Sequence, residues 1–260
     1  MINRVFVVVE PNIKKFGIER LSKERDLLTE LKSFNGESCQ NVYYLLNELK
    51  SQNLEPILLT WSDIVEFEFC KNDLVIIPQW YITSRKFPRN EEQHDLMIDN
   101  LDSLTEIGAH IILLHRSIYF WDLLDETSYS GKKNGMHRGE TASIRIESRH
   151  PILTKGLDHF LSSNVFHKDY FEFIYPEAGR CNVLVSKTVK NYEYEKFIGF
   201  GYYEEPSESF IFIIDVGFVG DDYTQTQLFE LLLRNTLHFL KQHVKEENEP
   251  VFFDPGKELN

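Results

Sequence analysis

The stretch GAHIILLH, residues 108–115, decides the fold class of this 260-residue chain. It opens with a glycine, which commonly ends a helix, and continues into a strand expected at residues 110–115. Residues 111–114 of this strand form an unbroken aliphatic run. Such a run is typical of a strand that is buried on both faces of a parallel sheet. Residues 90–106, just upstream, carry apolar side chains on one side of an expected helix. A helix that leads directly into a buried strand indicates a βαβ unit.

The same alternation of strand and helix extends toward the N-terminus. Buried strands are expected at Val5–Val9 and at residues 56–60 and 73–78. A helix is expected after Ser38, where four apolar residues recur at helical spacing (Val42, Leu45, Leu46 and Leu49). This pattern predicts a three-layer, doubly wound α/β fold of the flavodoxin-like type with a mostly parallel central sheet.

Beyond Trp121 the pattern changes to short strands. They are expected at residues 141–147, 171–175, 182–187, 197–203 and 210–215. Some of these strands should pair as a short antiparallel extension of the sheet, and residues 224–243 should form a long final helix. We therefore expect one domain over residues 1–243 and a charged C-terminal tail over residues 244–260.

Composition excludes several functional classes. The formal net charge of −13 disfavours nucleic acid and anionic membranes as partners, because both attract Lys and Arg. No apolar stretch approaches the roughly 20 residues that cross a bilayer, and the N-terminus does not resemble a signal peptide. Cys39, Cys70 and Cys181 lack metal-type spacing and are interpreted as reduced thiols of a cytoplasmic protein.

The loops that follow the parallel strands are where a ligand should bind. In open parallel sheets, ligands sit beyond the carboxyl ends of the strands. These loops supply the candidate ligand-binding residues Glu10, Trp61, Trp80, Arg116 and Phe218. His137 and His150, from later loops, complete the candidate ligand-binding set. Aromatic faces beside polar groups suit a small polar ligand such as a sugar, although aromatic packing at the rim of the sheet is the alternative.

His115 is the main candidate catalytic residue, because it directly follows the aliphatic run and precedes an expected helix near Ser117. In hydrolases this strand-to-helix turn presents the nucleophile. Here it presents an imidazole, which fits acid–base catalysis, a ligand hydrogen bond, a metal ligand or a structural histidine. No cysteine lies in a G-x-C-x-G turn and no G-x-S-x-G surrounds Ser117, so cysteine-dependent glutamine hydrolysis is not expected.

A metal site is a weaker hypothesis. His115, His137 and His150 all lie near loops or loop–strand junctions, and three imidazoles can hold zinc. Their separations match no metal-binding motif, so no metal ligand is assigned. A divalent metal such as zinc remains the one cofactor to test. His150-Pro151 also has a structural interpretation, in which proline keeps His150 extended and Gly156 permits a turn.

Several segments together resemble the trehalose-utilisation (ThuA-like) family of the class I glutamine amidotransferase-like superfamily. Residues 108–115 resemble its glycine, aliphatic strand and terminal histidine, and residues 150–157 (HPILTKGL) resemble its H-P-I-x-x-G-L segment. The ordered matches are completed by Ser130-Gly131 with Met136-His137, by Asp169-Tyr170, and by Asp215-Val216-Gly217-Phe218 leading into the final helix. The resemblance spans roughly residues 1–243.

The resemblance implies an amidotransferase-like fold, a link to carbohydrate metabolism and the frequent absence of an amidotransferase cysteine. The chain departs from the family pattern at three positions: Ser130 replaces a glycine, Lys168 replaces one of two acidic residues, and Phe218 replaces a histidine. Of the site of the ThuA-like family, the chain retains chiefly three histidines: His115, His137 and His150.

Three functions remain open from the sequence. The first is a ThuA-like protein that binds a small sugar or sugar derivative, with His115 as acid–base catalyst and Asp169 or Glu140 orienting an imidazole. The second is a non-catalytic subunit or scaffold with a degenerate site, since a fold can outlive its chemistry. The third is a metal-dependent hydrolase. Whether the chain is an enzyme, such as a sugar-active hydrolase, and whether it forms a homo-oligomer are left open.

Overall fold

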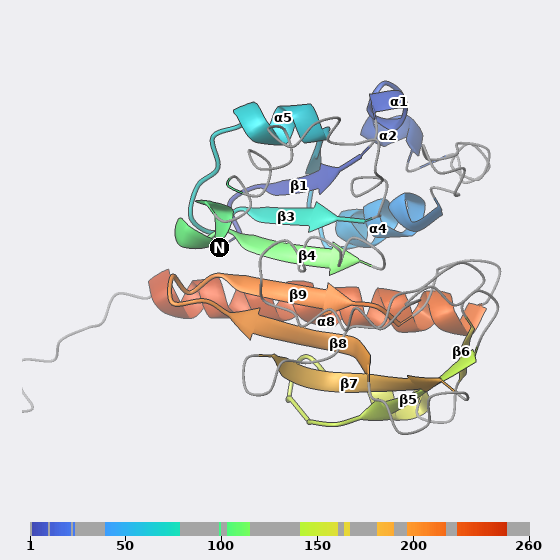
Figure 1. Ribbon diagram of the computed structural model, residues 1–260. Helices are drawn as coiled ribbons and strands as arrows, with labels where there is room; N and C mark the ends of the chain where they lie inside the picture. The colour runs from blue at the N-terminus through green and yellow to red at the C-terminus, as the bar shows by residue number, and fades with distance from the viewer. Residues whose placement is uncertain are drawn as a thin grey trace, which may run out of the picture.

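The computed structural model describes residues 2–9, 11–21, 23, 40–78, 99, 103–114, 141–160, 164–166, 181–189, 197–216 and 223–248. Within these ranges the chain forms one nine-stranded sheet with helices on its faces (Figure 1). The strand order is β2-β1-β3-β4-β9-β8-β7-β5-β6. The sheet divides into a parallel part and an antiparallel part that meet at β9.

The parallel part contains β1 (Val5–Val8), β2 (Pro56–Leu59), β3 (Leu74–Ile77), β4 (His110–Leu114) and β9 (Phe210–Ile214). Its order, β2-β1-β3-β4-β9, is the flavodoxin-like order, in which the chain switches direction across the sheet between β1 and β3. The continuous aliphatic runs explain this arrangement, since β1, β3, β4 and β9 are buried along their whole length, whereas Ile57 of the edge strand β2 is exposed. The expected fold class is confirmed.

The antiparallel part contains β5 (Thr141–Ile146), β6 (Asn164–Phe166), β7 (Asn182–Val189) and β8 (Phe197–Glu204). β8 pairs with β9 and continues the sheet through β7 and β5 to the edge strand β6. The sequence did not predict β6, because three residues are too few to show a periodicity. The strand expected at residues 171–175 lies outside the described residues.

Two apolar layers cover the opposite faces of the sheet, as the alternation of side chains along a strand requires. Val5 and Val7 point into a core shared with α4 (Gln40–Ser51) and α8 (Tyr223–Asn248). Phe6 and Val8 point into the other core, which includes Ile64 of α5 (Trp61–Glu66). Shorter helices complete the layers: α1 (Pro11–Lys14), α2 (Gly17–Leu21) and the 3-10 helix η3 (Leu157–Phe160).

The long helices follow the predicted apolar stripes. The predicted stripe residues of α4 (Val42, Leu45, Leu46, Leu49) and of α8 (Leu228, Phe229, Leu232, Leu233, Leu237, Leu240) are all buried. Arg234 of α8 donates to both carboxylate oxygens of Glu48 on α4, at 2.9 and 3.0 Å, which ties the two helices together across one face. α8 continues to Asn248, past the boundary expected at residue 243. Among the described helices, none is long and apolar enough to cross a membrane.

Gly108 ends the helical segment 103–106 as its position in the sequence predicts. Its φ is +79°, and an added Cβ would lie 3.2 Å from the Ser207 carbonyl oxygen. The Ala109 N–H donates to the Leu104 carbonyl at 2.9 Å, which closes the helix end. The chain then continues directly into β4.

Candidate functional site

The carboxyl ends of β1, β3, β4 and β9 all lie at one edge of the sheet, where the arrowheads in Figure 1 point. Most of the predicted site residues follow these strands, but the structure does not describe them. Eight predicted residues lie outside the described residues: Glu10, Trp80, His115, Arg116, His137, Glu140, Asp169 and Phe218. Their roles stay predictions. Trp61 begins α5 directly after β2, and its backbone alone is described.

A buried ion pair lies at the carboxyl end of β9. Lys187, on β7, and Asp215, directly after β9, are 0% and 2% exposed. The Lys187 ammonium donates to the Asp215 carboxylate Oδ2 and, at 3.0 Å, to the Asp215 carbonyl oxygen. Because β8 lies between β7 and β9, the lysine reaches across one strand to make this pair. Buried charges persist only when they are paired in this way.

The register of the sheet brings this pair beside the carboxyl end of β4. Leu114 of β4 is the register partner of Ile214 of β9. Asp215 follows Ile214, and its N–H donates to the Gly199 carbonyl of β8 at 2.8 Å. His115 is the residue that follows Leu114 in the sequence. At this point of the carboxyl edge, the structure therefore describes the Asp215 carboxylate, which is bound by the Lys187 ammonium.

Sequence reasoning placed Asp215 at the end of a strand but gave it no role, and it missed Lys187. One signal was available, because Lys187 interrupts the otherwise uncharged strand NVLVSKTV. A lysine inside a buried strand needs a partner or a route to solvent. Nothing in the sequence identifies that partner, which lies 28 residues away.

A second polar network joins the loops that follow β1 and β2. Thr60 caps α5: its hydroxyl accepts from the Asp63 N–H at 3.4 Å, and the Asp63 carboxylate accepts from the Thr60 N–H at 2.5 Å. The Lys14 ammonium, from α1, donates to the same carboxylate at 2.8 Å. Partial burial opposes the charged carboxylate, but hydrogen bonds from Lys14 and Thr60 outweigh it and lower the pKa of Asp63. This capping box fixes the turn in which Trp61 follows Thr60.

His150 lies away from this edge. Its Nδ1 accepts from the N–H groups of Ile152 and Leu153, at 3.2 and 3.1 Å, and its backbone exchanges hydrogen bonds with the Thr154 hydroxyl. Its ring packs edge-on against Phe239 of α8, at 5.4 Å between centroids. Phe239 in turn contacts Phe210, the first residue of β9.

These contacts place His150 toward the amino end of β9, in the turn that the sequence HPILTKG predicted. Gly156, at φ +82°, completes this turn. The two backbone donors hold Nδ1 as an acceptor, and burial lowers the imidazole pKa, so His150 is neutral near pH 7. Nε2 is the ring nitrogen that remains for a ligand. Within the described ranges, no three potential metal ligands come together.

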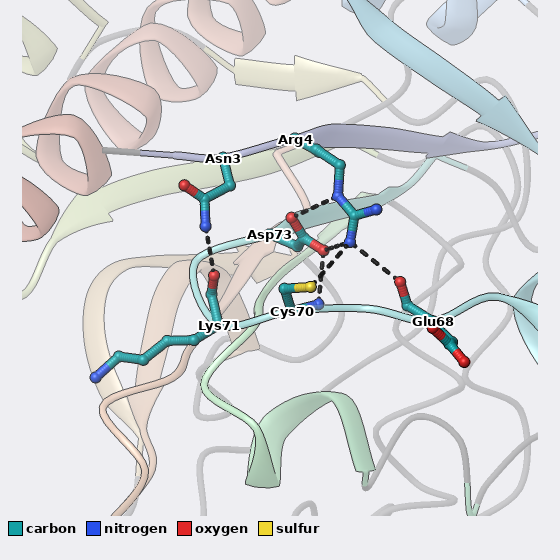
Figure 2. Close-up of polar contacts among 6 residues, drawn as sticks. All are labelled: Asn3, Arg4, Glu68, Cys70, Lys71 and Asp73. Atoms are coloured by element: carbon teal, nitrogen blue, oxygen red, sulfur yellow. Dashed lines mark hydrogen bonds and ion pairs between the residues drawn. The ribbon is translucent and has the colours of Figure 1, made fainter.

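Neither of the two described cysteines is placed as an amidotransferase nucleophile. Cys181 is largely buried, and burial raises the pKa of its thiol to about 12. Cys70 is exposed and lies just before β3, at the amino edge. Figure 2 shows it beside Arg4 and Asp73: the Arg4 guanidinium contacts the Cys70 sulfur at 3.4 Å, and the Cys70 N–H donates to the Asp73 carboxylate at 2.8 Å. Thioester chemistry at the carboxyl edge would need a thiol at that edge, whereas Cys70 lies at the amino edge.

Comparison with solved structures finds the same overall fold in other proteins. A proposed component of GMP synthase from Thermoplasma acidophilum is similar over 95% of this chain and 98% of its own, at 12% identity and a TM-score of 0.56. A proposed ThuA-like protein from Bacteroides uniformis is similar over 91% and 90%, at 12% identity and 0.51. A cytoplasmic protein from Salmonella typhimurium is similar over 78% and 87%, at 10% identity and 0.52.

At these identities the likeness defines the fold and does not assign the chain to the ThuA-like family. No protein-family model and no curated protein sequence matches the chain.

Proposed function

We propose that the chain is a ThuA-like protein of carbohydrate metabolism that binds a small sugar or sugar derivative at the carboxyl edge of the sheet, without glutaminase activity. The observation that carries this proposal is the buried Lys187–Asp215 pair at the end of β9. A hydroxyl-rich ligand needs fixed charged or polar groups beside its binding position, and ligand sites of this fold lie at this edge.

His115 is the proposed acid–base residue, because it follows Leu114, the register partner of Ile214. An imidazole titrates near neutral pH and can therefore both donate and accept a proton. Asp169 keeps its proposed role as the residue that orients an imidazole, and Asp215 offers a second carboxylate near this position. Six residues are proposed to contact the ligand: Glu10, Trp61, Trp80, Arg116, His137 and Phe218. His150, also a predicted ligand-binding residue, is left out of this set because its ring packs on Phe239 toward the amino end of β9. The protein is expected in the cytoplasm.

A thermal-shift screen of sugars, sugar acids and sugar lactones tests this proposal. We expect at least one compound to raise the melting temperature of the wild-type chain, and His115→Ala to abolish that shift. His159→Ala is the matched control, since His159 is exposed on η3 and should leave the shift unchanged. The proposal fails if a broad panel gives no shift, or if both variants respond like the wild type.

The same preparation distinguishes the alternative functions. Zinc, manganese or iron that co-purifies in stoichiometric amount, measured by elemental analysis without added metal, would favour a metal-dependent hydrolase. A stoichiometric protein partner, recovered together with no ligand response, would favour a non-catalytic subunit. The replacements at Ser130, Lys168 and Phe218 are the observation that motivates this second function.

A further inference from the structure

A cavity of about 580 Å³ opens at the amino edge of the sheet, opposite the candidate site. It lies between the start of β1 and the turn that joins α4 to β2. Its lining residues are Ile2, Asn3, Arg4, Val5, Gln52, Asn53, Leu54, Glu55 and Lys241. The volume is in the range of cavities that hold a small molecule or a few side chains. We call it the amino-edge cavity.

The polar groups around this cavity are largely engaged within the protein. Arg4 forms a paired hydrogen bond with the Asp73 carboxylate, and the Asn3 side chain donates to the Lys71 carbonyl at 2.8 Å (Figure 2). The Lys241 ammonium donates to the Gln52 carbonyl at 3.0 Å, close to the end of α4. What these contacts leave for an occupant is the partly exposed side chain of Leu54, with Ile2 and Val5 nearly buried beside it, inside a charged rim.

α8 passes this cavity before the C-terminal segment, residues 249–260, begins. Lys241 lines the cavity, and α8 continues seven residues further to Asn248, a rise of about 10 Å. Glu249-Pro250 follows, and a residue that precedes proline is disfavoured in a helix, which accounts for the helix end. A chain that reverses there covers roughly 3.3 Å per residue, so Phe253 can return about 16 Å, past the level of Lys241.

The composition of that segment matches the cavity. Residues 245–260 are mostly polar, and Val251-Phe252-Phe253 is their one run of consecutive apolar residues. Acidic residues flank the run at Glu249 and Asp254, and Arg4 and Lys241 provide two of the three charges in the cavity lining, against Glu55. Apolar side chains would enter, and opposite charges would face each other at the rim.

We propose that Val251-Phe252-Phe253 docks in the amino-edge cavity of its own chain and fastens the C-terminal segment across the start of β1 and the α4–β2 turn. Burial of two phenylalanine rings is the driving force, because each ring removes a large apolar area from water. The docked segment would cover the amino edge of the sheet and leave the carboxyl edge open for a ligand.

Photo-cross-linking of the full chain tests the proposal directly. With Phe253→benzoylphenylalanine, irradiation should link residue 253 to peptides that contain residues 2–5, 52–55 or 241, as identified by mass spectrometry. Lys257→benzoylphenylalanine is the matched control and should give a weaker and more dispersed pattern. Links to any other surface, links between two chains in a mixture of isotopically labelled and unlabelled protein, or no link at all would overturn the proposal.

Hydrogen exchange of the unmodified chain provides the second measurement. Phe252→Ser/Phe253→Ser should accelerate exchange of the amides at residues 52–55 by roughly fivefold or more, because docking protects this turn. Lys257→Ser/Glu258→Ser changes the same segment without touching the apolar run and should leave exchange as in the wild type. Equal exchange in the two double variants would refute docking, whatever the cross-links show.

Discussion

His110 makes the stability of the protein depend on pH. Its side chain is buried at the start of β4, where Nδ1 accepts from the Phe210 N–H at 3.2 Å. Among the described residues, its Nε2 has no hydrogen-bond partner. Burial, with smaller contributions from the charges of His243 and Lys71, lowers the pKa of His110 from 6.5 to about 4. A proton on this ring would be a buried, poorly compensated charge.

Acid should therefore destabilise the native state well above pH 4. Below pH 6.5 the unfolded chain binds a proton at His110 that the folded chain does not bind, so stability falls as pH decreases from 6.5 toward 4. From pH 7 to pH 5 this group should remove about 2 kcal/mol from the free energy of unfolding. Urea denaturation at the two pH values measures the loss.

The variant His110→Asn should reduce this loss, because the amide oxygen can still accept from Phe210 but the side chain does not titrate. His159→Asn replaces an exposed histidine and is the matched control, with the full wild-type loss expected. If His110→Asn loses as much stability between pH 7 and pH 5 as the control, the buried imidazole is not the cause.

The Lys187–Asp215 pair should be costly to break from one side. Lys187→Met leaves the Asp215 carboxylate buried without its ammonium partner, and we expect a loss of about 3–5 kcal/mol in the free energy of unfolding. Asp215→Asn should cost a similar amount. The double variant should lose clearly less than the sum, because neither charge then remains, and a double-mutant cycle by urea denaturation measures the difference.

The exposed pair Lys71–Glu208 provides the comparison, with a separation of 2.9 Å and both side chains more than half exposed. Lys71→Met should cost below about 1 kcal/mol, since water screens both charges. Additive losses at Lys187 and Asp215, or losses as small as that at Lys71, would contradict the tight coupling that the geometry indicates.

At the scale of the elements, α5 depends on its cap more than the longer helices do. It spans Trp61–Glu66, fewer than two turns, so the capping box of Thr60 and Asp63 satisfies a large share of its free backbone N–H groups. Thr60→Ala should cost about 1 kcal/mol in the free energy of unfolding, whereas Thr60→Ser keeps the hydroxyl and should cost little. Urea denaturation compares the three proteins, and an equal loss in both variants would exclude the hydroxyl as the reason.

The elements that the sequence predicted best are those with the strongest local pattern. β1, β3 and β4 were found within one residue at each end, because a continuous aliphatic run is sufficient to mark a strand that is buried on both faces. α8 was found with its full apolar stripe, but its last turn was missed because residues 244–248 are mainly charged. β6 was missed because its three residues carry no pattern.

The site was less predictable than the fold for a physical reason. A strand end can be located from the local sequence, so the carboxyl edge followed from the alternation of elements. Which side chains meet there depends on register across neighbouring strands. Lys187 and Asp215 come together because β7, β8 and β9 are adjacent, and no local pattern encodes that adjacency. His150 shows the converse, since its turn was predicted but its position against Phe239 of α8 was not.

At the scale of the whole molecule, β9 joins the two parts of the sheet. It pairs in parallel with β4 and antiparallel with β8, so the apolar layers on both faces continue across it. The parallel strand next to β4 is not the strand that follows it in the chain. It is β9, residues 210–214, which comes nearly last in the described fold.

This late strand has a consequence for how the protein is made. On the ribosome, β4 is complete about 100 residues before β9 is synthesised, which at 5–20 residues per second leaves roughly 5–20 s. During that interval the four earlier parallel strands present an unpaired apolar edge at Ile111–Leu114, the kind of edge that pairs with other chains. The nascent chain therefore passes through a stage in which β4 lacks its partner β9. A chaperone would protect the nascent chain most effectively by covering this edge of β4 during that stage.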